Sequence, residues 1–375
     1  MTDEPRIWLT RPQAGEAELD EIRGVLESGV LTQGPKVAEF ERLVAELVGV
    51  PHAFATTSAT TALHLSLVAA GIGPGDEVLV PDFTFPATAN VVVQQGAVPV
   101  LVDIDLETFA MDADDLDGRA TDRARAVIPV HPFGLPADME PITRVSEARG
   151  LAVIEDAACA LGATYAGRQV GGIGLAGCFS FHPRKSITTG EGGMITTADD
   201  ELAGRIGLLR SHGGVRSEGR FTFEAAGFNY RMSDILAAVG VAQMRRLDAF
   251  LAARRRVAGW YDERLANREA VRIPRTPAGF THTFQSYVLL LDPAVSRDGV
   301  IRRLRADGIE TTIGTYALHA EPYFARTYAL RRGDRPRSLA AFERGLALPL
   351  HGGMTEDEVD LVVDGLEAAL RRNRA

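Results

Sequence analysis

The chain has 375 residues, with 40 Lys and Arg against 50 Asp and Glu, which gives a formal net charge of -10. This acidic balance, with no run of more than three basic residues, argues against nucleic acid and an anionic membrane surface as partners. With 46% hydrophobic and 24% charged residues, the composition is that of a folded globular protein and not of a disordered chain. Only two of the 40 basic residues are lysines, Lys36 and Lys185.

The sequence predicts a cytoplasmic protein of two or three domains, or of one large domain with an appendage. No apolar run reaches the roughly 18 residues that a transmembrane helix needs, and the amino terminus starts acidic without the apolar segment of a secretory signal. Cys159 and Cys178 form no CxxC pair and provide no disulfide framework, which fits a reducing compartment.

The first half of the chain alternates short apolar segments with helical ones, a pattern typical of βαβ units. We expect strands at residues 77–80, 98–102, 126–130 and 151–155, with helices at 86–95 and around 139–147. Near-continuous apolar strands of this kind predict a buried, mostly parallel sheet between helical layers. Ligands of such sheets bind at the carboxyl ends of the strands. The polar residues that directly follow the expected strands are Asp82, His131 and Asp156.

Beyond about Ser233 the pattern changes to arginine-rich helices, expected at residues 233–244 and 248–267. Residues 273–279 contain two prolines and a glycine and are typical of a linker or turn. A strand at 286–291, a helix near 300–306 and a terminal helix that opens with the capping-box pattern at Thr355 follow. We therefore predict a large domain over residues 1–250 and a smaller C-terminal α+β domain over residues 251–375.

Several familiar motifs are absent or stand in the wrong context. The segment Gly172 to Gly177 matches GxGxxG, but it leads into a strand-like segment, whereas a dinucleotide-binding fingerprint follows a strand and opens a helix. There is no GxxxxGK for a P-loop and no GxSxG for a hydrolase. The eight histidines show no HExxH or other ligand spacing, so no metal site is expected.

Lys185 is the residue that most strongly indicates chemistry. It stands in Ser180-Phe-His-Pro-Arg-Lys185, follows an expected strand and precedes a flexible Thr-Thr-Gly-Glu-Gly-Gly loop. The alternative is an ordinary surface lysine, but nearly every other cation of the chain is arginine. Only lysine can form a Schiff base, because a guanidinium stays protonated. A Schiff-base lysine indicates a carbonyl cofactor, most commonly pyridoxal 5′-phosphate.

This cofactor needs a carboxylate for its ring nitrogen, a flat partner for its ring and a cradle for its phosphate. Asp156 follows a strand and can supply the carboxylate. Phe85, just after another strand, can stack on the ring. The hydroxyl-rich run 56–61 precedes an apolar helical segment, whose first backbone N–H groups can bind a phosphate. Each feature alone also has a structural interpretation, as a helix cap for Asp156, an N-cap for the run and core packing for Phe85.

Taken together, these segments resemble the DegT/DnrJ/EryC1/StrS aminotransferase family, the sugar-aminotransferase branch of fold-type-I pyridoxal-phosphate enzymes. The resemblance covers nearly the whole chain. It includes the blocks at residues 28–35, 80–90, 131–134, 155–158, 180–193, 227–234 and 347–351.

The resemblance implies a role for each matching residue. Lys185 would carry the cofactor, Asp156 would bind the pyridine nitrogen, and Phe85 would stack on the ring. The phosphate would be bound by Ala59, Thr60 and Ser180, and by Asn229 of a neighbouring subunit. A homodimer with a shared active site is therefore expected. Lysine at 185 also separates the chain from related dehydratases, which carry histidine there.

The chain departs from the family pattern at Cys159, where the family commonly has glutamine near the phenolic oxygen of the cofactor. Leu236 also replaces a frequent glutamine, and Ala317 replaces a frequent proline. A thiol is a weaker and shorter hydrogen-bonding group than an amide. These changes leave the expected cofactor site intact but bear on the substrate.

The expected activity is transfer of an amino group from glutamate or glutamine to a keto group of a nucleotide-linked sugar. An aminocyclitol (inosose) substrate is the alternative within the same chemistry. A lyase or oxidative enzyme on the same fold, and a cofactor-binding regulator without activity, are the alternatives outside it.

Overall fold

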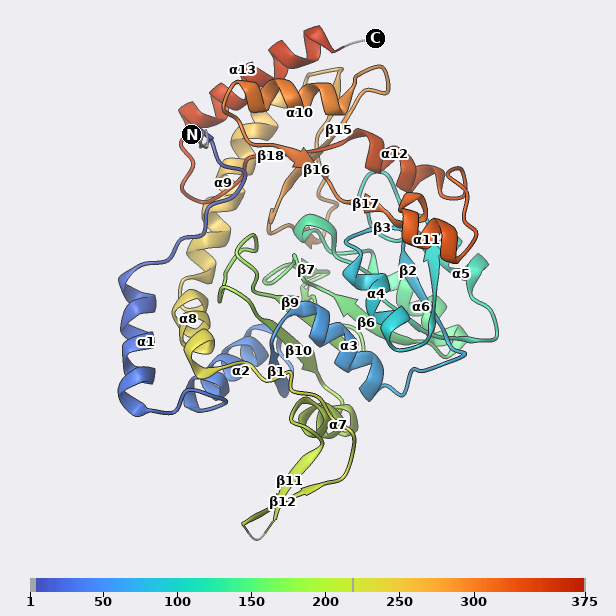
Figure 1. The fold of residues 1–375 in the computed structure, drawn as a ribbon. Helices are drawn as coiled ribbons and strands as arrows, with labels where there is room; N and C mark the ends of the chain where they lie inside the picture. The colour runs from blue at the N-terminus through green and yellow to red at the C-terminus, as the bar shows by residue number, and fades with distance from the viewer. Residues whose placement is uncertain (1–4, 218, 374–375) are drawn as a thin grey trace.

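The computed structural model describes residues 5–217 and 219–373, and its centre is a seven-stranded sheet (Figure 1). The strand order is β1-β10-β9-β6-β5-β2-β4, and the five strands from β9 to β4 run parallel to one another. β10 pairs antiparallel with β9, and β1 pairs antiparallel with β10, so β10 alone runs against the other six strands of this sheet. The strands are β1 (His52–Thr56), β2 (Glu77–Pro81), β4 (Val98–Val102), β5 (Ala124–Val127), β6 (Ala152–Asp156), β9 (Ala176–Ser180) and β10 (Gly193–Thr197). The predicted mostly parallel sheet is confirmed.

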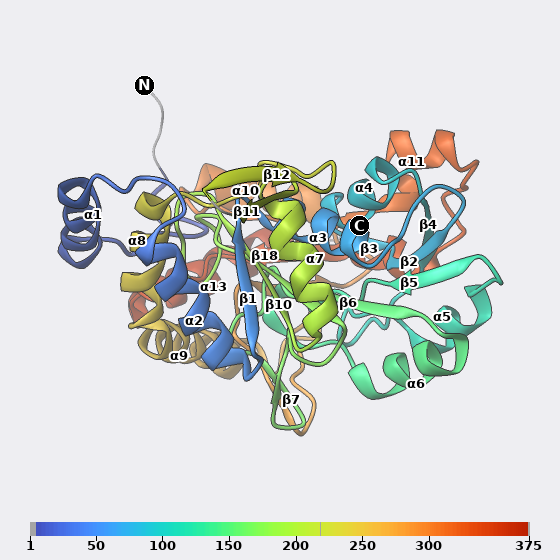
Figure 2. The same ribbon diagram turned by 90° about the horizontal axis from the view of Figure 1, so that it is seen from below.

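Helices cover both faces of this sheet. Successive residues of a strand point to opposite faces and therefore pack against different helices. Cys178 and Ile195 pack with α3 (Ala59–Ala69), α4 (Ala87–Gln94) and α7 (Asp200–Arg210) on one face. Phe179 and Met194 pack with α2 (Pro35–Val48) and α8 (Asp234–Met244) on the other. Farther along that second face, α5 (Ala113–Arg119) and α6 (Met139–Arg149) cover the strands toward β4 (Figure 2). The result is a three-layer α/β sandwich, as expected from the alternating pattern.

The C-terminal part forms a second core around a small antiparallel sheet. That sheet has the order β13-β15-β18-β16 and is covered by α9, α10 and α13. The elements are α9 (Leu247–Leu265), β13 (Val271–Arg272), β15 (Tyr287–Leu291), α10 (Arg297–Ala306), β16 (Thr312–Ile313), β18 (Gly345–Leu348) and α13 (Glu356–Arg372). The expected α+β part is therefore present. Residue 250 lies inside α9, and Ile7 packs into the C-terminal core, so the division of the chain at residue 250 remains a prediction.

Most expected elements agree with the structure to within one to three residues, and the differences have local causes. Helix α10 begins at Arg297, three residues earlier than expected, because the Ser296 hydroxyl accepts a hydrogen bond from the Gly299 amide and caps the helix there. The capping box at Thr355 is present, with bonds to Glu358 in both directions.

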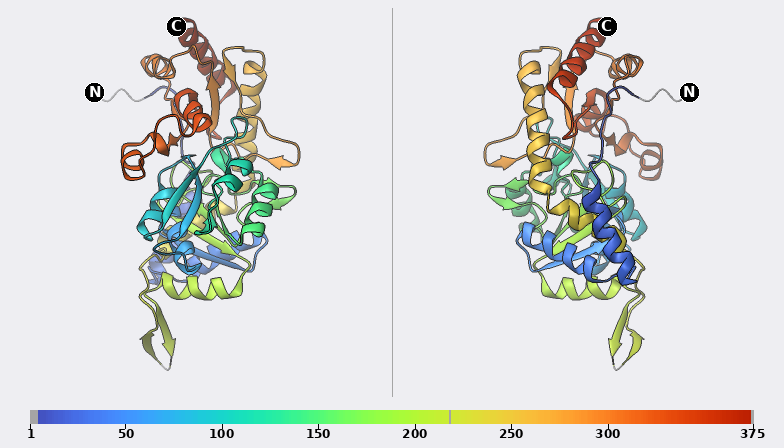
Figure 3. Two further views of the ribbon diagram at one scale, coloured as in Figure 1. Left: turned by 90° about the vertical axis from the view of Figure 1, so that its right-hand side faces the viewer. Right: turned by 90° about the vertical axis from the view of Figure 1, so that its left-hand side faces the viewer.

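Two features extend from the body of the molecule. The hairpin of β11 (Gly214–Ser217) and β12 (Arg220–Phe223) projects away from the layers (Figure 3). Helix α1 (Glu16–Ser28) lies against α8 at the opposite edge from β4 (Figures 1 and 2). The short elements between these parts are β3 (Phe83–Thr84), β7 (Thr164–Tyr165), β8 (Arg168–Gln169), β14 (Phe280–Thr281), β17 (Tyr316–Ala317), α11 (Pro322–Thr327) and α12 (Pro336–Arg344). None of the described helices has both the length and the apolar character to cross a bilayer.

Candidate active site

Asp156 is the last residue of β6 and is buried, with 6% of its surface exposed. Its Oδ2 accepts a hydrogen bond of 2.8 Å from the Thr88 hydroxyl, and its Oδ1 accepts one of 3.2 Å from the Ala158 amide. Burial raises the pKa of Asp156 above its usual value, although these bonds and the charge of Lys185 act in the opposite direction. The bonded partners of this buried carboxylate among the described residues are uncharged, so it is suited to a cationic N–H group, such as a protonated pyridine nitrogen.

Thr88 connects Asp156 to the loop that carries Phe85. The hydroxyls of Thr88 and Thr84 lie 2.9 Å apart, and Phe85 follows Thr84 directly. The Phe85 ring is 64% exposed and has an edge-on contact with Tyr316 at 6.4 Å between centroids. An exposed aromatic ring, joined to the buried carboxylate through Thr84 and Thr88, is available for stacking. The sequence interpretation missed Thr88, because Thr84 precedes the helix expected at residues 86–95 and the bond to Asp156 spans 68 positions.

The start of α3 provides the expected anion cradle. Ser58 caps the helix and accepts a hydrogen bond of 3.2 Å from Thr61, whereas the amides of Ala59 and Thr60 are bonded to no described residue. The strand register places Gly193 opposite both Thr56 and Ser180, which brings Ser180 to the same edge of the sheet. A Cβ atom at Gly193 would lie 2.3 Å from the Ser58 carbonyl, so the cradle requires glycine there.

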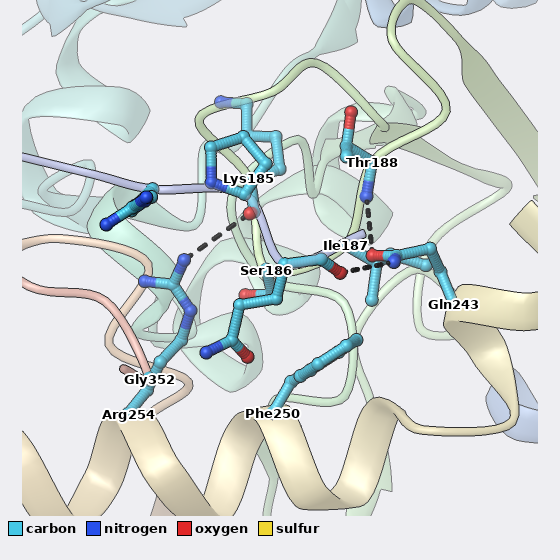
Figure 4. A pocket seen from close by; sticks show the side chains of 11 residues that line it. Lys185, Ser186, Ile187, Thr188, Gln243, Phe250, Arg254 and Gly352 are labelled. Carbon is cyan, nitrogen blue, oxygen red and sulfur yellow. Dashed lines mark hydrogen bonds between the residues drawn. The ribbon is translucent and has the colours of Figure 1, made fainter. Parts of the chain in front are cut away.

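Lys185 lies in the loop after β9, and its Nζ is 3.1 Å from the Sγ of Cys159. Two residues from the C-terminal part hold this loop. Arg254 donates to the Lys185 carbonyl at 3.4 Å (Figure 4). Gln285 donates to the Arg184 carbonyl at 2.8 Å. Arg254 is buried, also donates to three carbonyls around it, and its pKa is lowered to about 10 by burial. The sequence interpretation missed both residues, because contacts across 69 and 101 positions leave no local pattern.

A cavity behind this loop is not the cofactor site. It has a volume of about 20 Å³ and lies between Lys185, Gln243, Phe250 and Arg254 (Figure 4). That volume is close to the space of one water molecule and far below that of a cofactor.

The glycine motif at residues 172–177 has a structural role that explains why it is not a nucleotide site. The carboxylate of the buried Glu155 accepts hydrogen bonds of 2.7 Å from the amides of Gly171, Ile173 and Gly174. It accepts another from His131, whose second ring nitrogen accepts from the Ala137 amide. The anion bound by this loop therefore belongs to the protein itself.

Asn229, an expected site residue, and Lys36, the second lysine, lie apart from these contacts. Asn229 is exposed, and its Oδ1 accepts a hydrogen bond from Arg231 at 3.3 Å. Its role toward the phosphate of a neighbouring subunit remains a prediction. Lys36 forms ion pairs with Glu21 at 2.6 Å and Glu39 at 2.9 Å, so it joins α1 to α2.

The donor set fits pyridoxal 5′-phosphate. Lys185 and Cys159 lie in direct contact, and Asp156 connects through two hydroxyls to the loop of Phe85. The strand register brings Ser180 to the free amides at the start of α3. The specific role of each residue toward the cofactor remains a prediction.

Comparisons with known proteins agree with this interpretation. The model of the DegT/DnrJ/EryC1/StrS aminotransferase family matches residues 12–367. GDP-perosamine synthase of Caulobacter vibrioides is 44% identical over 99% of this chain and 100% of its own length. The aminotransferase TlmJ of Streptoalloteichus hindustanus has a TM-score of 0.92 and 35% identity over 98% of this chain and 99% of its own. The PLP form of the sugar aminotransferase Spr1654 of Streptococcus pneumoniae, described as putative, has a TM-score of 0.93 and 29% identity over 98% and 99%. The chain therefore belongs to the DegT/DnrJ/EryC1/StrS family of pyridoxal-phosphate-dependent aminotransferases.

Proposed function

We propose that this aminotransferase moves an amino group from glutamate or glutamine to a keto group of a nucleotide-linked sugar. The observation that carries the proposal is the contact of the Lys185 amine with Cys159, in a site that also holds the buried carboxylate of Asp156. The nucleotide-linked sugar is favoured by the 44% identity to a GDP-perosamine synthase over the full length. A free cyclitol is the alternative substrate of the same chemistry.

Pyridoxal 5′-phosphate supplies a carbonyl that holds the amino group and a ring that accepts electrons. The chain supplies the remaining functions. Lys185 Nζ attaches the cofactor and, when free, moves a proton to and from the reacting carbon. Asp156 Oδ holds the proton of the ring nitrogen. The amides of Ala59 and Thr60 bind the phosphate at the positive end of α3.

We propose that the active unit is a homodimer in which Asn229 of one subunit completes the phosphate site of the other. Asn229 is exposed, and so are apolar side chains of the projecting hairpin and of α1 with the loop after it, which a second copy would cover. These apolar residues are Leu19, Leu26, Val30, Leu31, Val215 and Phe223. Sedimentation should show a dimer, and Asn229→Ala should weaken cofactor binding while the dimer persists. A monomeric active enzyme would contradict this arrangement.

Lys185→Arg tests the chemistry, with Lys36→Arg as its matched control, because these are the only two lysines of the chain. Lys185→Arg should lose the visible absorption of the bound cofactor and all turnover, since a guanidinium forms no Schiff base. Lys36→Arg should retain both. An active Lys185→Arg enzyme would show that the assignment is wrong.

The substrate is tested with nucleotide-linked keto-sugars and free inososes, each incubated with the enzyme and glutamate. Formation of 2-oxoglutarate in proportion to aminated product identifies transamination, and the preferred acceptor identifies the substrate class. Release of ammonia without 2-oxoglutarate would favour a lyase or oxidative reaction instead.

A further inference from the structure

We propose that Cys159 and Lys185 form an oxidative cross-linking site. A peroxide oxidises the Cys159 thiol, and the Lys185 amine then bonds to the oxidised sulfur. The chemistry of this site depends only on the two side chains. Its consequence for the enzyme rests on the proposed role of Lys185 as the cofactor lysine.

The geometry places a nucleophilic amine against a thiol that solvent can reach. Lys185 Nζ lies 3.1 Å from Cys159 Sγ, and both residues are partly exposed. Among the residues that the structure describes, this thiol is the hydrogen-bonding partner of the amine. Exposure and an adjacent group that can capture the oxidised sulfur are the features of cysteines that respond to oxidants.

The backbone on both sides of this contact is fixed. The Cys159 carbonyl accepts a hydrogen bond of 3.2 Å from the Thr283 hydroxyl. On the other side, the Lys185 amide donates to the His182 carbonyl at 2.9 Å, and the Lys185 carbonyl is bonded to Arg254. The pair therefore does not need a loop rearrangement to react, and closing the remaining gap requires only side-chain rotation.

The second cysteine is a natural internal control. Cys178 is fully buried in β9, and among the described residues its bonded partner is the hydroxyl of Ser66 at 3.4 Å. The two lysine amines are bonded elsewhere, Lys185 to Cys159 and Lys36 to Glu21 and Glu39. Burial raises the pKa of the Cys178 thiol well above its usual value, which suppresses the reactive thiolate. Oxidation is therefore expected to select Cys159.

The reaction balances with one equivalent of hydrogen peroxide. In the first step the thiol sulfur takes one oxygen to become a sulfenic acid, and the peroxide is reduced to water. In the second step the unprotonated amine attacks sulfur, an S–N bond forms, and the S–O bond breaks with loss of a second water. The product is a sulfenamide that joins residues 159 and 185, with one hydrogen lost from the thiol and one from the amine. A thiol reductant attacks the sulfur and releases the amine again.

The consequence is control of cofactor loading. A Lys185 nitrogen that is bonded to sulfur cannot condense with the carbonyl of pyridoxal 5′-phosphate. Conversely, a lysine already attached to the cofactor cannot capture the oxidised sulfur. The cross-link between Cys159 and Lys185 is thus expected to form only when Lys185 is free.

The test treats the full-length protein, with and without bound pyridoxal 5′-phosphate, with hydrogen peroxide and maps the peptides by mass spectrometry. The cofactor-free protein should give a peptide pair linked through residues 159 and 185, about 2 Da lighter than the sum of its parts. When pyridoxal 5′-phosphate is then added, the peroxide-treated protein should develop no visible cofactor absorption until a thiol reductant is also added. The loaded protein should give little linked peptide.

Cys159→Ser should take up the same amount of cofactor with and without peroxide treatment. Cys178→Ser, like the unsubstituted protein, should take up less cofactor after peroxide. The peptide map of the unmodified protein decides the question even if a variant folds poorly. A Cys159 peptide that carries about 16 Da of added oxygen beside a free Lys185 would overturn the proposal, whether or not the enzyme proves to be an aminotransferase.

Discussion

His319 and Asp82 form a buried ion pair whose removal should destabilise the protein strongly. Both side chains are fully buried, and His319 Nδ1 lies 2.6 Å from Asp82 Oδ2. His319 Nε2 lies 2.9 Å from the Arg332 carbonyl. Because both ring nitrogens face acceptors, both carry a proton and the ring is an imidazolium. The pair fixes β17 beside β3, next to the Phe85 loop.

His319→Ala leaves the Asp82 carboxylate buried without its cation, although the amide of residue 319 still donates to Oδ1 at 2.7 Å. Removing one partner of a buried ion pair costs about 3–5 kcal/mol of unfolding free energy. The lower end of this range is expected here, since one bond to the carboxylate remains. His52→Ala is the matched control, because His52 and Asp200 lie 2.7 Å apart, but the Asp200 side chain is 95% exposed. That change should cost less than about 1 kcal/mol.

Urea unfolding followed by circular dichroism, at one protein concentration, measures both changes. Burial lowers the pKa of His319, but the bond and charge of Asp82 outweigh it, so the folded pKa lies above the usual 6.5. The stabilisation is therefore complete below about pH 6.5 and is lost as the pH rises through the folded pKa. The difference in unfolding free energy between the unsubstituted protein and His319→Ala should therefore shrink as the pH rises. Equal losses in His319→Ala and His52→Ala, or a difference that grows with pH, would refute the reasoning.

Three further changes test the site. Thr88→Val removes a hydrogen bond to the buried Asp156 carboxylate and should cost about 1.5–3 kcal/mol of stability and weaken cofactor binding, as measured by absorption titration. Thr84→Val keeps that bond and should have the smaller effect. Gly193→Ala places a methyl group 2.3 Å from the Ser58 carbonyl and should reduce cofactor affinity about tenfold or more, whereas Gly204→Ala in α7, with open space around it, should bind normally. Cofactor binding by Gly193→Ala at the original affinity would contradict the cradle. Lys36→Met should cost less than about 1 kcal/mol and leave turnover unchanged, because Arg245 still bonds to Glu21 and Glu39. Lost turnover in folded Lys36→Met would instead place Lys36 at the substrate.

The local patterns of the sequence predicted most of the architecture. Apolar strands closed by polar residues located the sheet and its carboxyl edge, where Asp156 lies. Thr355 starts a helix where its capping-box pattern indicated, and Ser58, in the hydroxyl-rich run 56–61, caps α3. These predictions succeed because hydrogen bonds of caps and burial of strands act over a few residues. Lysine is rare in this chain and only lysine can form a Schiff base, so the sequence alone indicated Lys185.

The tertiary structure decided which side chains meet. The bond of Thr88 to Asp156 spans 68 positions, and the contact of Lys185 with Cys159 spans 26. The Glu155 carboxylate inside the glycine loop depends on the packing of β6 against the segment that leads into β9. Such contacts leave no periodic trace in the chain, because they arise only when separate elements pack together. The sequence by itself therefore determined the elements and the kinds of chemical groups, whereas the fold decided how those groups are paired, buried and charged.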